Sequence, residues 1–436
     1  MPSARGPGFE ALRGPIGLRR LVGQCLSSAR FSIVWDEESL DKWSLVPDCA
    51  LNNERRRGLE LAKKDTKDKA APTRGQASLA VFRRRLDRID AELLKLLSER
   101  TSVVLQVKEA KQATGGRIWV PEREAAQLQR LSRLNRKSET PVPEGALSSI
   151  FGEVLSASRA LQRDLRVAYL GPQGTYSELA AHEHFGSQAE FVPVSNIAAI
   201  FDAVEKKQVE LGVVPFENST EGIVGQAIDA FVESPLRILG ERQLDIRHAL
   251  LGHTKNLGQV RRVLAHPQAI AQCRNWLEVH LPHAELREVS SNAAVAQQAA
   301  RTKSSAAIAS ASAASRYRLE VLQEGIQDLS RNVTRFVVVG DADQVAPVPG
   351  EKISILFSVK NEVGVLARIL APLARAGIDV LKVESRPKRG HLWDYVFFMD
   401  LCGDLEDRNV GRAVAAIRKH CVWLKVLGSY AAAQPK

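Results

Sequence analysis

Apolar residues recur at alternating spacings of three and four from Phe82 to Ala110, which is the pattern of one helical face. A break follows at residues 114–116, where a threonine precedes two glycines. Helical patterns resume after Pro121, a residue suited to a first helical turn, and again between Pro143 and Gln162. Three helices are therefore predicted. The first, at about 30 residues, would be roughly 45 Å long and must pack against other helices.

From Leu165 to about residue 340, short apolar runs alternate with helical runs. This βα alternation predicts parallel sheets, with binding sites at the carboxyl ends of the strands. A Pro-rich linker follows at residues 346–352. Residues 351–436 then have the order strand, helix, strand, strand, helix, strand, which is typical of a ferredoxin-like sandwich.

Residues 1–77 have a different character, because Gly, Pro and Arg punctuate the start and a polar, charged run follows. The acidic stretch at residues 36–41 argues against an organelle transit peptide. We expect a disordered extension, or a spurious one if translation starts at a non-Met codon near Leu79 or Val81. No function is assigned to this segment.

Composition narrows the class of protein. A chain of 436 residues with 44% hydrophobic and 25% charged residues is typical of a soluble globular protein of about three domains. No apolar run approaches the roughly 20 residues of a membrane helix, so a membrane partner is not expected. The net charge of +11 comes from scattered Lys and Arg without a nucleic-acid motif, which favours small anionic substrates over nucleic acid. Five dispersed cysteines without CxxC spacing predict neither disulfides nor a metal site, which suits a reducing cytoplasm.

Two cations and a polar pair stand out in the helical region. Arg100 occupies an apolar seam, where a guanidinium without an anionic partner is costly, so it must pair with a carboxylate or bind an anionic ligand. Lys111 follows eleven residues later on nearly the same helical face, about 20° away. Arg83 lies roughly 100° off that face, so a partner chain would have to supply it. Ser158 and Gln162 are four residues apart and share a face.

These residues resemble those of the all-helical chorismate mutases over residues 80–163, through FRRRLDRIDAELLKLLSER, VKEAK, PEREAAQL and IFGEVLSASRALQ. The resemblance implies a site made of Arg83 from the partner chain, Arg100, Lys111, Arg123, Glu124, Ser158 and Gln162. The reaction is a rearrangement without a nucleophile. The cations would clamp two carboxylates, and Lys111 and Gln162 would donate to the breaking ether oxygen. Val120 replaces a usual acidic residue, which leaves open an inactive mutase domain used for dimerisation.

Polar side chains cluster at three places in the α/β region. GPQGTYS follows a strand and opens a helix, which is a natural carboxylate site. VVPFENSTEG places polar residues just past a buried strand, and NVTRF places them where another strand begins. The candidate residues of these motifs are Thr175, Ser177, Glu217, Asn218, Ser219, Thr334 and Arg335. Taken alone, each motif could be only a turn or a strand end.

In order, these motifs resemble prephenate dehydratase over residues 165–340, together with IRHALLG, AHPQAIAQCRNWL and AAIASASAASRYRLEVL. The resemblance implies two α/β lobes like those of periplasmic binding proteins, with the site between them. Thr334 would donate a hydrogen bond to the leaving hydroxyl and Arg335 would hold a substrate carboxylate. The other candidates would line the pocket, with Glu217 as a proton partner. Arg318 stands where the family commonly has Gly. No metal or redox cofactor is required.

GVLARIL and ESRP in the last region resemble the ACT domain of such dehydratases, in which phenylalanine binds between paired ACT domains. The residues expected at this allosteric site are Gly364, Glu384, Ser385, Arg386 and Pro387. Val363 replaces the usual proline.

We therefore expect a multidomain chain: an N-terminal extension (1–77), an all-α mutase bundle forming an intertwined dimer (78–163), a two-lobed dehydratase domain (165–342) and an ACT domain (351–430). As a homodimer or higher homo-oligomer it would convert chorismate to prephenate and then to phenylpyruvate, with phenylalanine as allosteric inhibitor. Two alternatives remain, a dehydratase with an inactive mutase domain and a ligand-binding sensor without catalysis.

Overall fold

The computed structural model describes residues 31–35, 43–47, 74–114, 121–254, 256–289, 292–329, 331–341, 350–387 and 395–433. Val120 and most of the N-terminal extension lie outside these ranges. By its contacts the chain forms two compact units, residues 1–95 and 96–436. Within the extension, β1 (Phe31–Trp35) and β2 (Trp43–Pro47) pair antiparallel.

The three predicted helices are confirmed. The first, α2 (Arg74–Thr114), begins eight residues before the predicted start at Phe82. It is followed by α3 (Pro121–Asn135) and α4 (Glu144–Gln162). The side chain of Asn135 turns the chain between α3 and α4, because its amide donates to the carbonyl of Val142 at 2.7 Å and accepts from the Val142 N–H at 2.8 Å.

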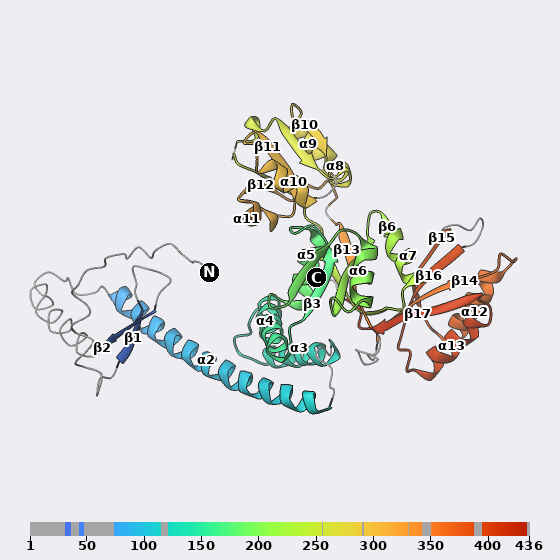
Figure 1. The fold of residues 1–436 in the computed structure, drawn as a ribbon, viewed down its shortest axis with the longest axis horizontal. Coiled ribbons are helices and arrows are strands. Elements are labelled where there is room, and N and C mark those ends of the chain that lie inside the picture. The colour runs from blue at the N-terminus through green and yellow to red at the C-terminus, as the bar shows by residue number, and fades with distance from the viewer. Residues whose placement is uncertain are drawn as a thin grey trace, which may run out of the picture. The chain divides into compact units, whose positions relative to one another are not determined.

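The first α/β lobe is built on a six-stranded sheet with the order β4-β3-β5-β13-β7, and β6 pairs with β5 (Figure 1). Its elements are β3 (Arg166–Leu170), α5 (Tyr176–Phe185), β4 (Glu190–Val194), α6 (Ile197–Glu205), β5 (Leu211–Asn218), β6 (Gly222–Ile223), α7 (Gly225–Glu233), β7 (Arg237–Asp245) and β13 (Val333–Gly340).

The prediction of parallel sheets is wrong for part of this lobe, whose sheet is mixed. β3 is parallel to β4 and β5, whereas β13 is antiparallel to both β5 and β7. The reason is the path of the chain. It leaves the sheet after β7, builds a second lobe, and returns as β13 between β5 and β7, so no βα crossover sets the direction of β13.

The second lobe has a five-stranded sheet with the order β10-β9-β11-β8-β12, also mixed, since β8 is antiparallel to β11 and β12. Its elements are β8 (Ala249–Gly252), η1 (Leu257–Gln259), β9 (Arg262–Ala265), α8 (Pro267–Gln272), α9 (Arg274–His280), β10 (Glu285–Glu288), α10 (Asn292–Ala299), β11 (Ser305–Ala309), α11 (Ala313–Tyr317) and β12 (Glu320–Glu324). The chain passes between the lobes twice, after β7 and before β13.

The C-terminal domain has the predicted ferredoxin-like order, with an antiparallel sheet β15-β16-β14-β17. Its elements are β14 (Lys352–Ser358), α12 (Val365–Arg375), β15 (Val380–Pro387), β16 (Tyr395–Cys402), α13 (Arg408–Arg418) and β17 (Trp423–Tyr430). One side of the sheet packs under α12 and α13, through Ile353 and Ile355 among others.

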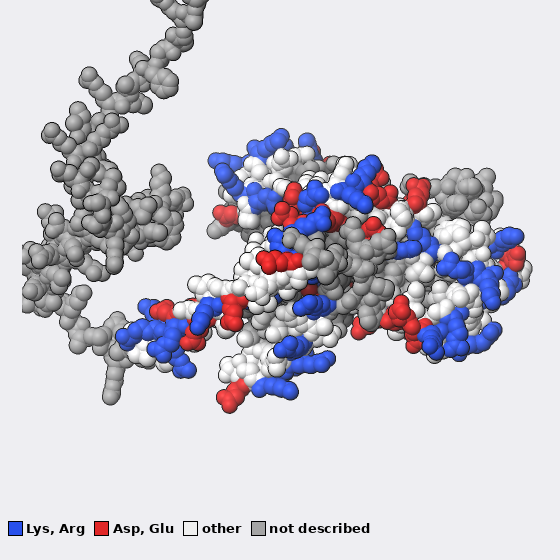
Figure 2. Space-filling model, turned by 60° about the horizontal axis from the view of Figure 1, so that its bottom comes forward, with Lys and Arg blue, Asp and Glu red and all other residues white. Residues whose placement is uncertain are grey.

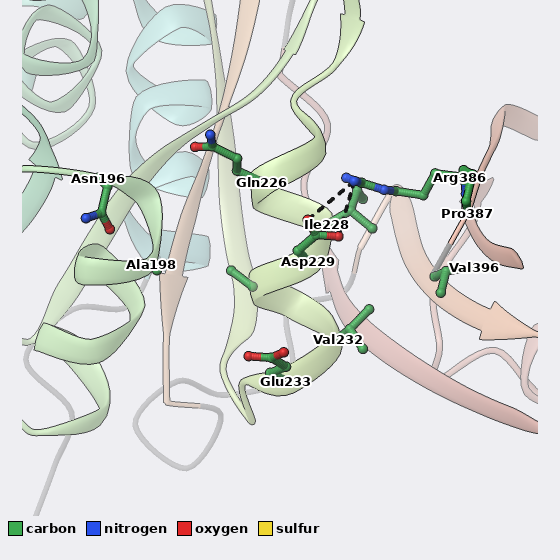
Figure 3. Close-up of a pocket in the computed structure, with 11 residues that line it drawn as sticks. Asn196, Ala198, Gln226, Ile228, Asp229, Val232, Glu233, Arg386, Pro387 and Val396 are labelled. Atoms are coloured by element: carbon green, nitrogen blue, oxygen red, sulfur yellow. Dashed lines mark hydrogen bonds and ion pairs between the residues drawn. The ribbon is translucent and has the colours of Figure 1, made fainter. Parts of the chain in front are cut away.

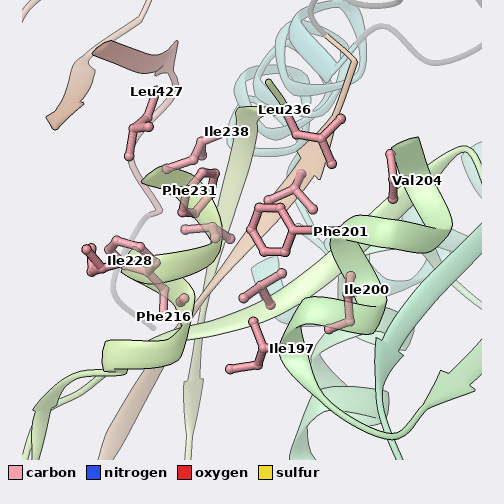
Figure 4. Close-up of a cluster of buried hydrophobic side chains, with 14 of the residues drawn as sticks. Ile197, Ile200, Phe201, Val204, Phe216, Ile228, Phe231, Leu236, Ile238 and Leu427 are labelled. Carbon is pink, nitrogen blue, oxygen red and sulfur yellow. The ribbon is translucent and has the colours of Figure 1, made fainter. Parts of the chain in front are cut away.

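The other side of this sheet is buried against the first lobe. Phe398 and Leu427 belong to the same apolar core as Phe216, Phe231 and Ile238 of that lobe, and Figure 4 shows Leu427 beside Ile238. The backbone of β17 approaches so closely that a Cβ at Gly428 would overlap the Ile238 carbonyl oxygen. The first lobe and the C-terminal domain therefore share one core.

Among the residues that the structure describes, no helix is both long and apolar enough to cross a membrane.

Candidate active sites

The seam cation Arg100 meets a polar partner from α4. Its guanidinium donates to the Ser158 hydroxyl and, at 3.4 Å, to the Val154 carbonyl. Burial lowers the pKa of Arg100, as expected for a charge placed among apolar side chains. The structure thus brings together the two predicted site residues Arg100 and Ser158.

Lys111 lies close enough to Arg123 and Glu124 for their charges to act on it. Burial lowers the pKa of Lys111, the charge of Arg123 lowers it further, and the charge of Glu124 opposes both. Glu124 accepts from Arg159 at 2.5 Å. Gln162 donates to the Ser158 carbonyl at 3.1 Å, whereas its buried Oε1 has no hydrogen-bond partner among the described residues.

The open amide atom of Gln162 is a feature that a ligand would satisfy, because buried polar atoms are normally hydrogen-bonded. The assignment of oxygen and nitrogen in such an amide follows from its partners, and the Ser158 carbonyl fixes the NH₂ group on its own side. The open Oε1 would therefore accept from a ligand, and the second amide hydrogen is left to donate to one. Arg83 belongs to the unit of residues 1–95, and its side chain is exposed.

The glycine turn before α5 is held by its own helix. Thr175 is the N-cap: its hydroxyl accepts from the Glu178 N–H at 3.4 Å and donates to the Leu170 carbonyl at 3.0 Å. Gly174, with a φ of 89°, donates its N–H to the Glu178 carboxylate. Ser177 is buried in the first turn. The remaining N–H groups at this helix start suit a carboxylate ligand.

Thr334 and Asn218 are cross-strand partners on β13 and β5. The Asn218 amide donates to the Thr334 hydroxyl at 2.9 Å and to Asn332 Oδ1 at 2.8 Å. Its oxygen accepts from the N–H and the hydroxyl of Thr220 at 2.9 and 2.5 Å. Because Thr334 accepts from Asn218, its hydroxyl hydrogen is left to donate elsewhere. Ser219 continues the ladder by exchanging bonds of 2.8 and 3.0 Å with Val333.

The second lobe joins this network through residues that the motifs did not single out. Gln272 Oε1 accepts from Asn332 at 3.0 Å and lies 2.8 Å from Nε2 of His248. The other ring nitrogen of His248 lies 3.2 Å from the Tyr176 hydroxyl. Burial lowers the pKa of His248, so the ring is neutral near pH 7. Asn332 and Gln272 both fall inside quoted motifs, NVTRF and AHPQAIAQCRNWL, which is the signal that could have identified them.

A second contact between the lobes lies at the turn before α5. Arg316 of α11 donates to Gln173 at 2.5 Å and pairs with Glu178 at 3.1 Å, while the Tyr317 hydroxyl donates to the Gln173 carbonyl at 2.9 Å. Arg318 ends α11 with a φ of 54°, in the left-handed region. This conformation gives a physical reason for the glycine expected at position 318.

The structure does not bring Arg335 or Glu217 to the side of the sheet that carries Thr334. Successive residues of a strand point to opposite faces, so Arg335 faces the C-terminal domain. It is 6% exposed and pairs with Glu241 and Asp400, both at 2.6 Å. Glu217 pairs with Lys382 of β15 at 2.5 Å. The predicted contact of Arg335 with a substrate carboxylate is therefore not supported by this geometry.

Arg335 belongs to a buried network of paired charges. Burial opposes its charge, but Tyr430, Asp400 and Glu241 more than offset this effect and raise the pKa of Arg335. Lys352 adds a second cation 2.8 Å from Glu241, and the pKa of Glu241 is lowered by Arg335 and Lys352 although its burial acts in the opposite direction.

Four of the predicted allosteric residues, 384–387, lie on β15, the edge strand of the C-terminal sheet, and the fifth precedes α12. Gly364 precedes α12 with a φ of 75°, and Glu384 and Ser385 are exposed on the edge strand β15. Arg386 turns toward the first lobe, where it donates to the Gly225 carbonyl and pairs with Asp229 at 3.3 Å. Arg386 and Pro387 line a cavity of about 470 Å³ whose opposite wall is α7 (Figure 3).

Figure 2 shows Lys and Arg interspersed with Asp and Glu on the face in view, rather than gathered into one stripe. Within the described ranges, no three His, Cys, Asp or Glu side chains gather closely enough to hold a metal ion.

Comparisons with known proteins agree with this domain order. Family models match residues 82–163 (Chorismate mutase type II), 167–344 (Prephenate dehydratase) and 353–419 (ACT domain). The bifunctional chorismate mutase/prephenate dehydratase of Aquifex aeolicus (strain VF5) is 41% identical over 353 residues, covering 81% of this chain and 97% of that protein.

Two solved structures resemble the part after the helices. The prephenate dehydratase from Arthrobacter aurescens in complex with L-Phe is 32% identical, with a TM-score of 0.57, and covers 62% of this chain and 92% of its own. GqqA, described as a novel type of quorum quenching acylase, is 29% identical with a TM-score of 0.57, covering 62% and 98%. From the three matched domains and the relative that shares nearly its whole length, the chain belongs to the family of bifunctional chorismate mutase/prephenate dehydratases.

Proposed function

We propose that this chain catalyses two consecutive steps of phenylalanine biosynthesis. The helical domain rearranges chorismate to prephenate. The two-lobed domain converts prephenate to phenylpyruvate with loss of carbon dioxide and water. Phenylalanine acts on the C-terminal domain as a feedback inhibitor. Membership of the family supports both activities. The alternatives of a sensor or of an inactive mutase domain would leave at least one of the matched enzyme domains without its activity.

The observation that carries the dehydratase assignment is the bond from the Asn218 amide to the Thr334 hydroxyl, at 2.9 Å. It fixes the oxygen and directs the hydroxyl hydrogen away from Asn218, as a hydrogen-bond donor to a leaving hydroxyl requires. As the carboxylate carbon leaves prephenate as carbon dioxide, its bonding electrons enter the ring. The ring hydroxyl departs with a proton as water, and the ring becomes aromatic. The N–H groups before α5 near Thr175 and Ser177 would hold a carboxylate.

In the mutase site no proton needs to move, so the residues act by clamping the substrate and by stabilising charge. Arg100 and Arg123 would grip carboxylates, and Lys111 with the second amide hydrogen of Gln162 would donate to the ether oxygen. Ser158 already anchors Arg100. Glu124 would bind a substrate hydroxyl, and Arg83 would come from a second copy of the chain.

A dimer through α2 is part of this proposal. Large apolar residues lie exposed along the helix in the single chain, for example Phe82 at 57%, Leu86 at 58% and Leu93 at 52%. An amphipathic helix of this length buries such a seam only against other helices. The edge strand β15 likewise exposes Leu381 and Val383 beside Glu384 and Ser385, where paired C-terminal domains would enclose phenylalanine.

The same proposal includes a cytoplasmic location, supported by the free thiols of the described cysteines Cys273, Cys402 and Cys421. Neither reaction calls for a cofactor.

The test is to supply purified chain with chorismate and to follow chorismate, prephenate and phenylpyruvate together. Because chorismate rearranges slowly by itself, a reaction without enzyme and one with Arg100→Ala are needed as controls. Phenylpyruvate formed faster than in both controls supports the two activities. Consumption of chorismate no faster than without enzyme would leave only the dehydratase, to be tested directly with prephenate.

A further inference from the structure

The helix α4 has two polar faces. One face carries Ser158 and Gln162 toward the mutase site. The other docks on the first α/β lobe: the Glu153 carboxylate accepts from the Ser187 hydroxyl at 2.6 Å, and the Ser156 hydroxyl accepts from the Gln188 N–H at 3.1 Å.

Arg159 lies between these two faces and is 5% exposed. Its Nη1 donates to the Glu124 carboxylate at 2.5 Å, and its Nη2 donates to the backbone carbonyl of Phe185. Phe185 is the last residue of α5, and the carbonyl end of a helix carries partial negative charge that favours a cation. One buried guanidinium is thus held by a mutase-domain carboxylate and by a helix end of the dehydratase domain.

The close fit around this contact limits the freedom of Arg159. A Cβ at Gly186, the residue after Phe185, would overlap the side chain of Ser156, so the side chains of α4 pack directly on the backbone that follows α5. Burying a guanidinium stabilises a structure only when its hydrogen bonds are satisfied, and removing one partner leaves an uncompensated charge. Arg159 therefore fixes the position of Glu124 as long as the helix end of the dehydratase domain is in place.

We infer that Arg159 is a positioning residue of the mutase site: its guanidinium links Glu124 to the C-terminal end of α5, so that the dehydratase domain completes the mutase site. This inference rests on the proposed role of Glu124 in binding chorismate. The mutase domain then depends on the dehydratase domain for part of the geometry of its site. The same short helix α5 begins at Thr175 and Ser177 of the dehydratase site and ends at the anchor of Arg159.

The experiment measures mutase kcat and KM with chorismate, and dehydratase kcat and KM with prephenate, for the full chain and its variants. Arg159→Met keeps the apolar stem and removes both hydrogen bonds. Its mutase kcat/KM should fall about ten-fold, mainly through KM, while its dehydratase kcat/KM stays within about two-fold. Arg159→Lys, which can reach only one anchor, should show a smaller loss of the same kind.

Glu153→Ala is the matched control, because it removes another contact of α4 with the dehydratase domain without touching Glu124. It should leave the mutase KM unchanged. Glu124→Gln and the double variant Glu124→Gln/Arg159→Met complete a double-mutant cycle. The double variant should lose no more mutase kcat/KM than Glu124→Gln alone.

Two results would overturn the inference. One is that Arg159→Met and Arg159→Lys turn over chorismate as the wild type does. The other is that Arg159→Met lowers the mutase kcat/KM by the same factor in the wild type and in Glu124→Gln. A Glu124→Gln protein with wild-type kinetics would instead refute the proposed role of Glu124. Should Arg159→Met fail to fold, Arg159→Lys in the same cycle decides, since it retains the charge.

Discussion

Arg335 follows Thr334 directly in the chain, yet its guanidinium pairs with Asp400 of the C-terminal domain at 2.6 Å, on the opposite side of the sheet. The neighbouring strand repeats this division, because Asn218 bonds Thr334 while Glu217 pairs with Lys382 of the C-terminal domain at 2.5 Å. Two adjacent cross-strand pairs thus connect the dehydratase pocket with the domain expected to bind phenylalanine.

This relationship predicts that Asp400→Asn weakens feedback inhibition. The variant removes one charge, but Arg335 keeps Glu241 as a partner, so the fold should persist. The phenylalanine concentration for half-inhibition should rise about five-fold, because the C-terminal domain and β13 would then be coupled less strongly. Prephenate turnover without phenylalanine should stay within about two-fold of the wild type.

The control for Asp400→Asn is Glu362→Gln, which breaks an exposed ion pair with Arg368 inside the C-terminal domain. It should leave inhibition unchanged. Equal inhibition of Asp400→Asn and wild type would show that the ion pair does not transmit the signal.

Thr334→Ala should lower the dehydratase kcat about 100-fold or more, which is the usual contribution of a positioned proton donor. Thr334→Ser keeps the hydroxyl and should retain most of the rate. Mutase turnover of chorismate should be unaffected by either change, and it serves as the internal control for folding. A Thr334→Ala protein that converts prephenate at the wild-type rate would remove Thr334 from the mechanism.

The dimer prediction concerns the apolar seam of α2. Leu86→Asp places a charge on a side chain that is 58% exposed in the single chain, so the isolated fold should tolerate it. A buried seam between two copies should not tolerate it, because an unpaired carboxylate there is costly. Light scattering should report a smaller assembly, and chorismate turnover should fall while prephenate turnover continues. Asp87→Asn, on the neighbouring position, is the control; an unchanged mass for Leu86→Asp would argue against this interface.

His184 predicts a loss of stability in mild acid. Burial, with the charges of Arg242 and Arg159 adding to it, lowers the pKa of His184 to about 3. A histidine whose pKa is depressed by folding contributes stability that is present above the unfolded pKa of about 6.5 and is lost as pH falls toward the folded value. At pH 5 this one group should cost about 1–2 kcal/mol relative to pH 7.

The measurement for His184 is the urea midpoint at pH 7 and pH 5. His184→Gln should reduce the difference between the two pH values, whereas His420→Gln, at an exposed position, should not. An undiminished pH dependence in His184→Gln would place the sensitive group elsewhere.

Local patterns predicted the helices well, because the three-four spacing of α2, α3 and α4 reflects contacts within each helix and one apolar side. The same holds for the C-terminal domain, whose strands and helices follow one another with short connections. The choice of Thr334 and Asn218 also came from local context, since both stand at strand ends, where sites form.

Residues far apart in the chain were beyond such patterns. Gln272 became part of the site only because the second lobe folds back beside β13, where Gln272 accepts from Asn332. The direction of β13 depended on the return path of the chain, which no periodicity records.

The sequence by itself determined the number and order of the domains, the helical seam, and the residue types suited to two anionic substrates. These properties follow from short-range periodicity and from side-chain chemistry. Only the tertiary structure decided which face of β5 and β13 meets which neighbour. A strand has two faces one residue apart, and the neighbouring domain covers one of them. For that reason Thr334 lies with Asn218 and Asn332, while Arg335, the next residue, is buried against the C-terminal domain.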